Sequence, residues 1–143
     1  MEDKIFGKMT FYYGWIKTET IELWGNSYSV RIRTSSAQND LPNELQQKAY
    51  TYFKTNLQKI AEESKKQVVE FVLSYSNEIE ENLGTNSVKE PIRLIAPKEV
   101  LFFQNGKYAV IFDTKWSEAG MAILCLENNI LEIGESYILE YEL

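Results

Sequence analysis

Apolar residues between positions 45 and 79 recur at every third or fourth position, and this pattern restricts the fold more than any other feature of the chain. They are Leu45, Ala49, Phe53, Leu57, Ile60, Val68, Val72, Tyr75 and Ile79. This spacing places side chains along one face of an α-helix, which is then buried against another element. The one gap, between Ile60 and Val68, contains the polar residues 62–66. We expect one long helix, kinked or straight across this gap, or two consecutive helices, ending before Gly84.

The start of the helical region is indicated by Pro42 and Asp40. Proline is favoured in the first helical turn, where its missing N–H has no partner to lose. Asp40, just upstream, is expected to cap the free amides or to interact with the helix dipole. Polar loops are expected on either side of the helical region, at residues 34–42 and 85–91.

The segments before the helical region are typical of β-strands. Apolar and polar residues alternate in residues 20–23 and again in residues 28–33, so each segment is expected to bury one face. Gly25-Asn26 between them favours a tight hairpin. The aromatic segment 10–15 is a further strand candidate.

The last third of the chain contains five further strand candidates. They are residues 100–103, 108–112, 121–126, 130–133 and 137–143. Asn105-Gly106 is the strongest hairpin signal in the chain, Asn128-Asn129 is expected to form another turn, and Gly134 to end a strand. The order of strands, helix and strands predicts an α+β fold. We expect a largely antiparallel sheet of six or seven strands, with one long or two consecutive helices on one face. A length of 143 residues fits a single domain, 1–143.

The formal net charge is −6, and the sequence contains no histidine. An acidic protein is poorly suited to the phosphate backbone of nucleic acids. Histidine is the commonest general base and metal ligand. We therefore expect no nucleic-acid partner, no metal and no cofactor.

The single cysteine, Cys125, lies in the apolar segment 122–126 and is expected to be a small buried hydrophobic residue. One cysteine in a short chain fits a reducing compartment. No apolar run approaches the ~18 residues of a membrane span. The N-terminus begins with acids, unlike a signal peptide. These features predict a cytoplasmic protein without membrane association.

Asp113 and Glu118 are the carboxylates with the strongest case for chemistry. Two carboxylates near one turn can act as an acid–base pair or hold a hard cation. Their spacing matches no calcium-binding loop. The preferred interpretation is a structural turn, in which Asp113 caps the turn and Trp116 fills the core.

The segment from residue 108 to 123 resembles a family of small uncharacterised bacterial proteins. The matching residues are Asp113, Trp116, Glu118, Gly120, Met121 and Ala122. Ser117 stands where that family often has Asp, and Ala119 where His is common, which weakens the case for a shared metal or catalytic site. The resemblance implies a domain of unknown function. Because relatives of such domains occur near bacterial toxin genes, it also suggests an immunity role.

Charge is divided unevenly along the chain. Residues 1–71 carry a net charge of +1 and residues 72–143 a net charge of −7. Five acids without a neighbouring base follow the last apolar strand candidates. They are Glu127, Glu132, Glu135, Glu140 and Glu142. An acidic face speeds association with a basic partner, so we expect these five residues to bind such a partner, for example a toxin.

These observations favour a non-enzymatic interaction protein, with inhibition of a toxin by an immunity protein as its specific form. Two alternatives remain open. One is a carboxylate-dependent enzyme or hard-cation-binding domain that uses Asp113 and Glu118. The other is a structural subunit that forms homo-oligomers.

Overall fold

A seven-stranded sheet forms the centre of the computed structural model, which describes residues 1–84 and 86–142. Its strands are β3 (Thr10–Phe11), β4 (Trp15–Leu23), β5 (Asn26–Thr34), β6 (Ile95–Phe102), β7 (Lys107–Thr114), β8 (Ser117–Leu126) and β9 (Asn129–Glu135). They lie in sequence order, and all neighbours are antiparallel except the parallel pair β5–β6. A second, two-stranded sheet is formed by β1 (Glu2–Asp3) and β2 (Gly7–Lys8).

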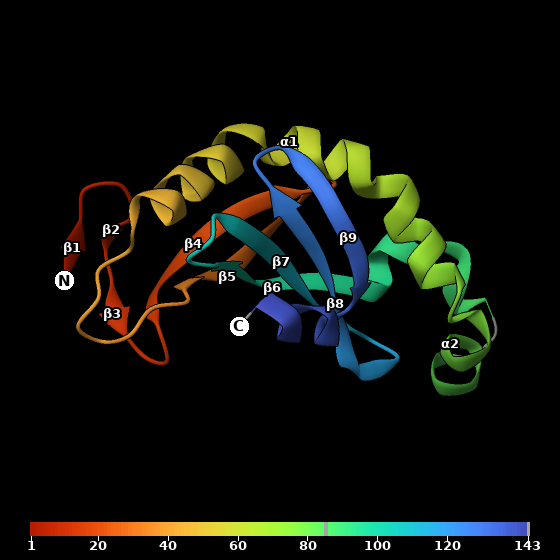
Figure 1. Cartoon of the computed structure of the whole chain (residues 1–143). Coiled ribbons are helices and arrows are strands. Elements are labelled where there is room, and N and C mark those ends of the chain that lie inside the picture. Colours follow the sequence, from red (N-terminus) through yellow and green to blue (C-terminus); the bar gives the residue numbers. More distant parts are fainter. Residues whose placement is uncertain (85, 143) are drawn as a thin grey trace.

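The long helix α1 (Glu44–Leu73) runs across one face of the sheet, which we call the inner face (Figure 1). It is followed by α2 (Ser76–Leu83) and two short 3₁₀ helices, η1 (Ser87–Lys89) and η2 (Pro91–Leu94). A last 3₁₀ helix, η3 (Ser136–Glu142), packs on the opposite, outer face. The predicted α+β class is confirmed, including its largely antiparallel sheet. None of the described helices is long and apolar enough to cross a membrane.

The start of α1 depends on Asn43 rather than on Pro42. Asn43 accepts a hydrogen bond from the Gln46 backbone N–H, and the Gln46 side chain accepts one from the Asn43 N–H, both at 2.9 Å. This capping box satisfies two amides that the helix leaves free. Pro42 lies before the cap, so the prediction that it opens the helix, with Asp40 as the cap, is wrong. Leu45, predicted to be in the core, is 50% exposed.

Helix α1 continues through residues 62–66, and the break between helices falls at Ser74-Tyr75. The expected long helix through the polar gap is confirmed, and the alternative of two helices divided there is wrong, because Ala61 and Ser64 are buried and continue the apolar stripe. The Ser64 hydroxyl donates to the Ala61 carbonyl at 3.2 Å and so needs no water. As predicted, the helical region ends before Gly84.

Three turns differ from the sequence prediction. The expected strand 10–15 is interrupted at Tyr12–Gly14, so that β3 folds back on β4. The β4–β5 turn is Trp24-Gly25, where both residues have positive φ, as a type I′ turn requires. The turn between β8 and β9 is Glu127-Asn128, one residue earlier than expected. The Asn105-Gly106 hairpin is confirmed.

The end of the chain differs most from its prediction. Residues 136–142 form η3 instead of an edge strand, and Leu143, like Thr85 in the predicted loop 85–91, lies outside the described residues. Gly134 lies inside β9 and does not end it. A Cβ at Gly134 would lie 3.1 Å from Ile138, so glycine lets η3 approach the strand closely.

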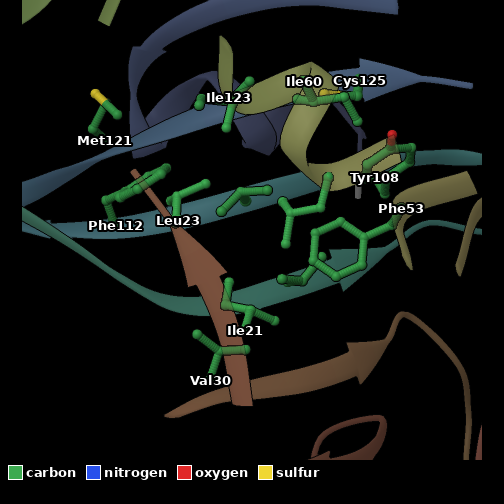
Figure 2. Close-up of a cluster of buried hydrophobic side chains, with 14 of the residues drawn as sticks. Ile21, Leu23, Val30, Phe53, Ile60, Tyr108, Phe112, Met121, Ile123 and Cys125 are labelled. Atoms are coloured by element: carbon green, nitrogen blue, oxygen red, sulfur yellow. The ribbon is translucent and has the colours of Figure 1, made fainter. Parts of the chain in front are cut away.

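The core has two unequal parts. The larger lies between α1 and the inner faces of β4 to β8, with residues such as Ile21, Phe53, Phe112 and Met121 converging from four elements (Figure 2). The smaller lies under η3 on the outer face. It contains Leu101, Phe103, Ala109, Ala122, Leu124, Ile138 and Leu139. Strands β6 to β8 are therefore apolar on both faces, whereas β4 and β5 are polar on their outer face.

Gly14 is expected to tolerate substitution much less than Gly25, although both have positive φ. A Cβ at Gly14 would lie 2.1 Å from the Thr34 carbonyl oxygen, whereas a Cβ at Gly25 meets no atom within 4 Å. Gly25→Ala should cost about 1–2 kcal/mol of stability through backbone strain alone. Gly14→Ala adds a clash and should cost about 3 kcal/mol. Urea unfolding of both variants measures the difference, and equal costs would contradict the assigned turn.

Candidate functional site

The turn between β7 and β8 and the strand residues beside it contain Asp113, Trp116, Glu118 and Gly120, through which the sequence resembles a family of uncharacterised proteins. Trp116 is buried, with 6% of its surface exposed, as its position between two apolar strands predicted. Its ring lies 5.7 Å from that of Tyr75, at the break between α1 and α2. Its carbonyl accepts a hydrogen bond from Asn82 of α2 at 3.3 Å. The turn therefore holds the helical segment against the end of the sheet.

Gly120 allows a close approach of backbones at the start of β8. Its φ is +70°, and a Cβ there would lie 2.8 Å from the Phe112 carbonyl oxygen and 2.7 Å from the Ser136 hydroxyl. Glycine is therefore required at this position. Trp116 and Gly120 are thus explained by the packing around this turn.

The two motif carboxylates are exposed, and each has a different setting. Asp113 forms an ion pair with Lys98 at 3.1 Å, and its side chain remains 70% exposed. It makes no hydrogen bond to the turn among the described residues, where Thr114 instead donates to the Ser117 carbonyl at 2.8 Å. Glu118 lies in the exposed first part of β8. Within residues 1–84 and 86–142, no group of three acidic or sulfur ligands is assembled for a metal ion.

Cys125 is fully buried on the inner face of β8. Burial raises the pKa of its thiol to about 12, so the thiolate is scarce at neutral pH. Burial likewise raises the pKa of the neighbouring Tyr108 above its usual range. The burial of Cys125 agrees with the prediction that it is a small buried hydrophobic residue, and Tyr108 packs in the same core.

The five predicted acids do not form one continuous surface. Glu135 accepts a hydrogen bond from the Tyr75 hydroxyl on the helix side of the sheet. Glu142 is bound by Lys107 at 3.0 Å, and only 13% of its side chain is exposed. Glu127 lies at the β8–β9 turn, beside α1. Glu132 on β9 and Glu140 on η3 are exposed, on two elements that pack together.

The same two elements also expose large side chains with apolar surface. Tyr137 and Tyr141 of η3 are 59% and 88% exposed, and Leu131 of β9 is 47% exposed. We call Leu131, Glu132, Tyr137, Glu140 and Tyr141 the C-terminal surface. Its tyrosines were assigned to a strand in the sequence prediction. In η3, Ile138 and Leu139 occupy the buried positions, and the two tyrosines are therefore exposed.

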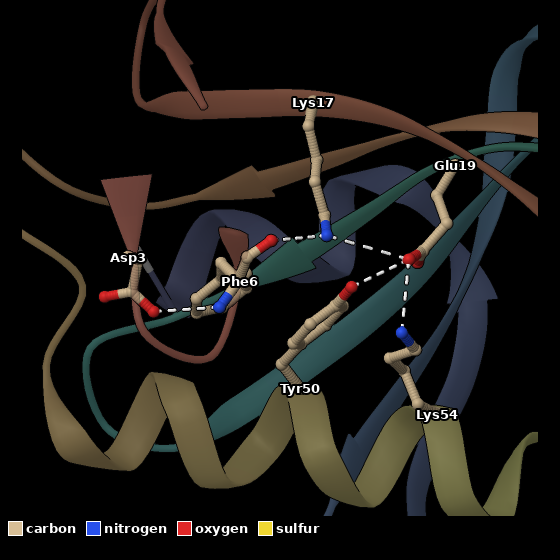
Figure 3. A network of polar contacts seen from close by, with 6 residues as sticks. All are labelled: Asp3, Phe6, Lys17, Glu19, Tyr50 and Lys54. Carbon is tan, nitrogen blue, oxygen red and sulfur yellow. Dashed lines mark hydrogen bonds and ion pairs between the residues drawn. The ribbon is translucent and has the colours of Figure 1, made fainter. Parts of the chain in front are cut away.

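Another polar cluster joins the N-terminal hairpin to α1 (Figure 3). The Phe6 ring stacks on Tyr50 of α1, with centroids 4.4 Å apart. The Asp3 carboxylate accepts hydrogen bonds from the Ile5 and Phe6 backbone amides at 2.9 and 2.8 Å. The Lys17 ammonium donates to the Phe6 carbonyl at 2.5 Å. The Asp3 hydrogen bonds are local, whereas the contacts of Phe6 with Lys17 and Tyr50 join residues far apart in sequence and have no local sequence signal.

Glu19 is the centre of this cluster. It accepts a hydrogen bond from the Tyr50 hydroxyl at 2.7 Å and pairs with Lys17 and Lys54 at 3.7 and 3.5 Å. Burial, with the neighbouring Glu19, raises the pKa of Tyr50 above its usual range. A tyrosine in this state is not a general base at neutral pH, so the cluster is best explained as an anchor for the hairpin.

A hollow of about 700 Å³ lies between this hairpin and the exposed side of α1. Lys4 and Ile5 border it on one side and Lys48 and Tyr52 on the other, with Glu127 at its edge. Its lining includes both lysines and acids. The candidate reactive residues Asp113, Glu118 and Cys125 do not line it.

Fold and surface together define an α+β protein in which Cys125 is buried, Asp113 is paired with Lys98, and the C-terminal surface exposes acids and tyrosines. The chain belongs to the DUF6985 family, a domain of unknown function whose family model matches residues 5–140. The resemblance to an uncharacterised family is confirmed at this level. No curated protein and no solved structure is significantly similar to the chain.

Replacing Trp116 by alanine should cost about 3–5 kcal/mol of stability, since the ring is buried against Tyr75. The matched control is the neighbouring exposed Lys115. Its alanine variant keeps the backbone contact to Leu94 and should change stability by less than about 0.5 kcal/mol. Thermal and urea unfolding measure both, and a Trp116→Ala protein that unfolds like the wild type would contradict the buried position.

Stability should fall as the pH rises above about 9. Burial raises the pKa of Cys125 from 9.0 to about 12, and the hydrogen bond to Glu135 raises that of Tyr75 from 10.0 to about 12. Each group releases its proton more easily when unfolded, so its stabilising effect is complete below the unfolded pKa and lost towards the folded pKa. Urea unfolding between pH 8 and pH 12 measures the slope. Cys125→Ala should make it shallower; an unchanged slope in that variant would contradict the pKa shift.

Proposed function

We propose that this chain is a non-enzymatic protein of the bacterial cytoplasm that binds a basic protein, and that this partner is a toxin which it inhibits. The observation that carries the proposal is the C-terminal surface, where η3 exposes Tyr137, Glu140 and Tyr141 and the contacting strand β9 exposes Glu132. No lysine or arginine follows Lys115 in the sequence. The negative field of this surface is therefore not cancelled by bases from its own segment.

The composition of this surface suits protein recognition. Tyrosine is enriched among the residues that contribute most to binding, because its large ring buries much area with little loss of rotational freedom. Acids around such rings attract a basic partner and raise the association rate. A nucleic-acid-cleaving toxin needs a basic surface for its substrate, so an acidic inhibitor is complementary to its active site.

The state of the reactive side chains also supports an interaction role. Cys125 is buried and protonated at neutral pH, and the Asp113 carboxylate is paired with Lys98. The cytoplasmic location is supported by the single cysteine of the sequence.

Glu132→Gln with Glu140→Gln should slow association with the partner, mainly at low salt. The Debye length falls from ~10 Å at 0.1 M salt to ~3 Å at 1 M, so the difference from wild type should shrink as salt rises. The control, Glu80→Gln with Glu81→Gln, removes the same charge from exposed positions on α2. Surface plasmon resonance against the partner captured from the native cell measures both rates. Equal slowing by the two double variants would mean that total charge alone matters.

Tyr141→Ala should act on the other rate constant. Loss of a central aromatic contact mainly speeds dissociation, at any salt concentration. The inhibitory role is tested separately, by expressing the captured partner with and without this chain. The partner should arrest growth when alone and not when the wild-type chain is present. A harmless partner would contradict the immunity role even if binding is confirmed.

A further inference from the structure

The outer face of β4 and β5 is left uncovered, because η3 packs only on the apolar half of the sheet. Exposed Thr18, Thr20, Ser29 and Arg31 lie on this part of the face. Antiparallel pairing sets Thr18 opposite Arg31 and Thr20 opposite Ser29. A hollow of about 490 Å³ lies here, bordered by Thr18, Ser29 and Arg31 and, from β6, by Lys98 and Glu99.

Arg31 is the uncompensated charge of this hollow. Parallel pairing places Arg31 beside Glu99 on β6. The Glu99 carboxylate, however, is hydrogen-bonded to the Arg33 guanidinium at 2.9 Å, and both side chains are less than 20% exposed. Among the described residues, Arg31 forms no ion pair. Glu99 thus lies near both Arg31 and Arg33, and its negative charge is already neutralised by the less exposed Arg33.

The remaining ion pair at this site is weakly held. Lys98 pairs with Asp113 at 3.1 Å, but the two side chains are 53% and 70% exposed. Exposed pairs of this kind contribute little free energy, so a stronger anion can replace the Asp113 carboxylate. Glu19, the next residue of β4, points to the helix side, where it binds Tyr50. The next acid on the outer face of β4, Glu22, is four residues from Thr18, roughly 13 Å along the strand. The hollow is therefore locally positive in an otherwise acidic protein.

The donors match one kind of ligand. A planar guanidinium binds two oxygens of a tetrahedral anion at once, hydroxyl groups donate to its other oxygens, and an ammonium adds a point charge. We propose that Arg31, Thr18, Ser29 and Lys98 form a binding site for a phosphate group, either free or as a monoester. The site is separate from the C-terminal surface and does not depend on the proposed partner.

The test is titration of the isotope-labelled protein with inorganic phosphate and with O-phosphoserine, followed by backbone amide NMR at constant ionic strength in chloride. Saturable shifts should be centred on Thr18, Ser29 and Arg31. Tighter binding of O-phosphoserine would identify the monoester as the preferred form, and tighter binding of phosphate the free ion. Shifts that do not saturate, or that spread over all basic residues, would overturn the proposal.

Three variants make the test specific. Arg31→Gln should weaken binding about tenfold or more, since it removes a charged hydrogen-bond donor. Arg93→Gln, at an exposed arginine that pairs with Glu90 away from this face, is the matched control and should bind like the wild type. Asp113→Asn should strengthen binding by releasing Lys98. Arg31 is exposed, so its variant should fold, which the same spectra verify. Unchanged affinity in folded Arg31→Gln would overturn the site.

Discussion

The packing of α1 across the inner face of the sheet is the interaction on which the rest of the structure depends. Strands β5 and β6 are parallel, so the chain must cross from one end of the sheet to the other between them, and α1 with α2 makes this crossing. The buried Gln46 side chain donates to the Phe102 carbonyl at 3.0 Å, which ties the first turn of the helix to β6. At the other end, Trp116 fixes the segment that returns to the sheet. Between these points α1 covers the inner face of the sheet. It does not contribute to covering the outer face.

The parts of this fold that local sequence patterns specify were predictable. The helical stripe, the strand alternation around Val30 and the Asn105-Gly106 hairpin each involve residues close in sequence, and all three are confirmed. Errors arose where tertiary contacts outweigh local pattern. Ser64 reads as polar surface but is buried, because its hydroxyl finds a partner in the helix itself. Residues 137–143 were predicted to form a strand, yet residues 136–142 form η3, whose Ile138 and Leu139 cover the apolar outer face of β6 to β8.

The candidate sites were less predictable for the same reason. Alternation alone implies that Glu132 and Glu135, three residues apart, lie on opposite faces, and the structure places Glu135 against Tyr75 on the helix side. The pairing of Glu142 with Lys107 joins residues 35 positions apart and has no local signal. No sequence pattern indicates that Glu99, which lies beside Arg31, forms its ion pair with Arg33 instead. The sequence thus shows where acidic residues are concentrated. Which charged side chains pair with one another follows only from the tertiary structure.

The uneven charge of the chain becomes a charge pattern in space because the sheet keeps the strands in sequence order. Exposed Glu132 and Glu140 lie with the last strand and η3, and Arg31 lies with the early strands, so both signs border the same outer side of the sheet. The proposed basic partner, attracted to the acidic end, would be repelled by Arg31 if it shifted towards β5. Opposite fields on one side would therefore restrict the orientation of that partner, which contributes to specificity more than to affinity. An anion held by Arg31 would weaken this repulsion and widen the range of allowed orientations.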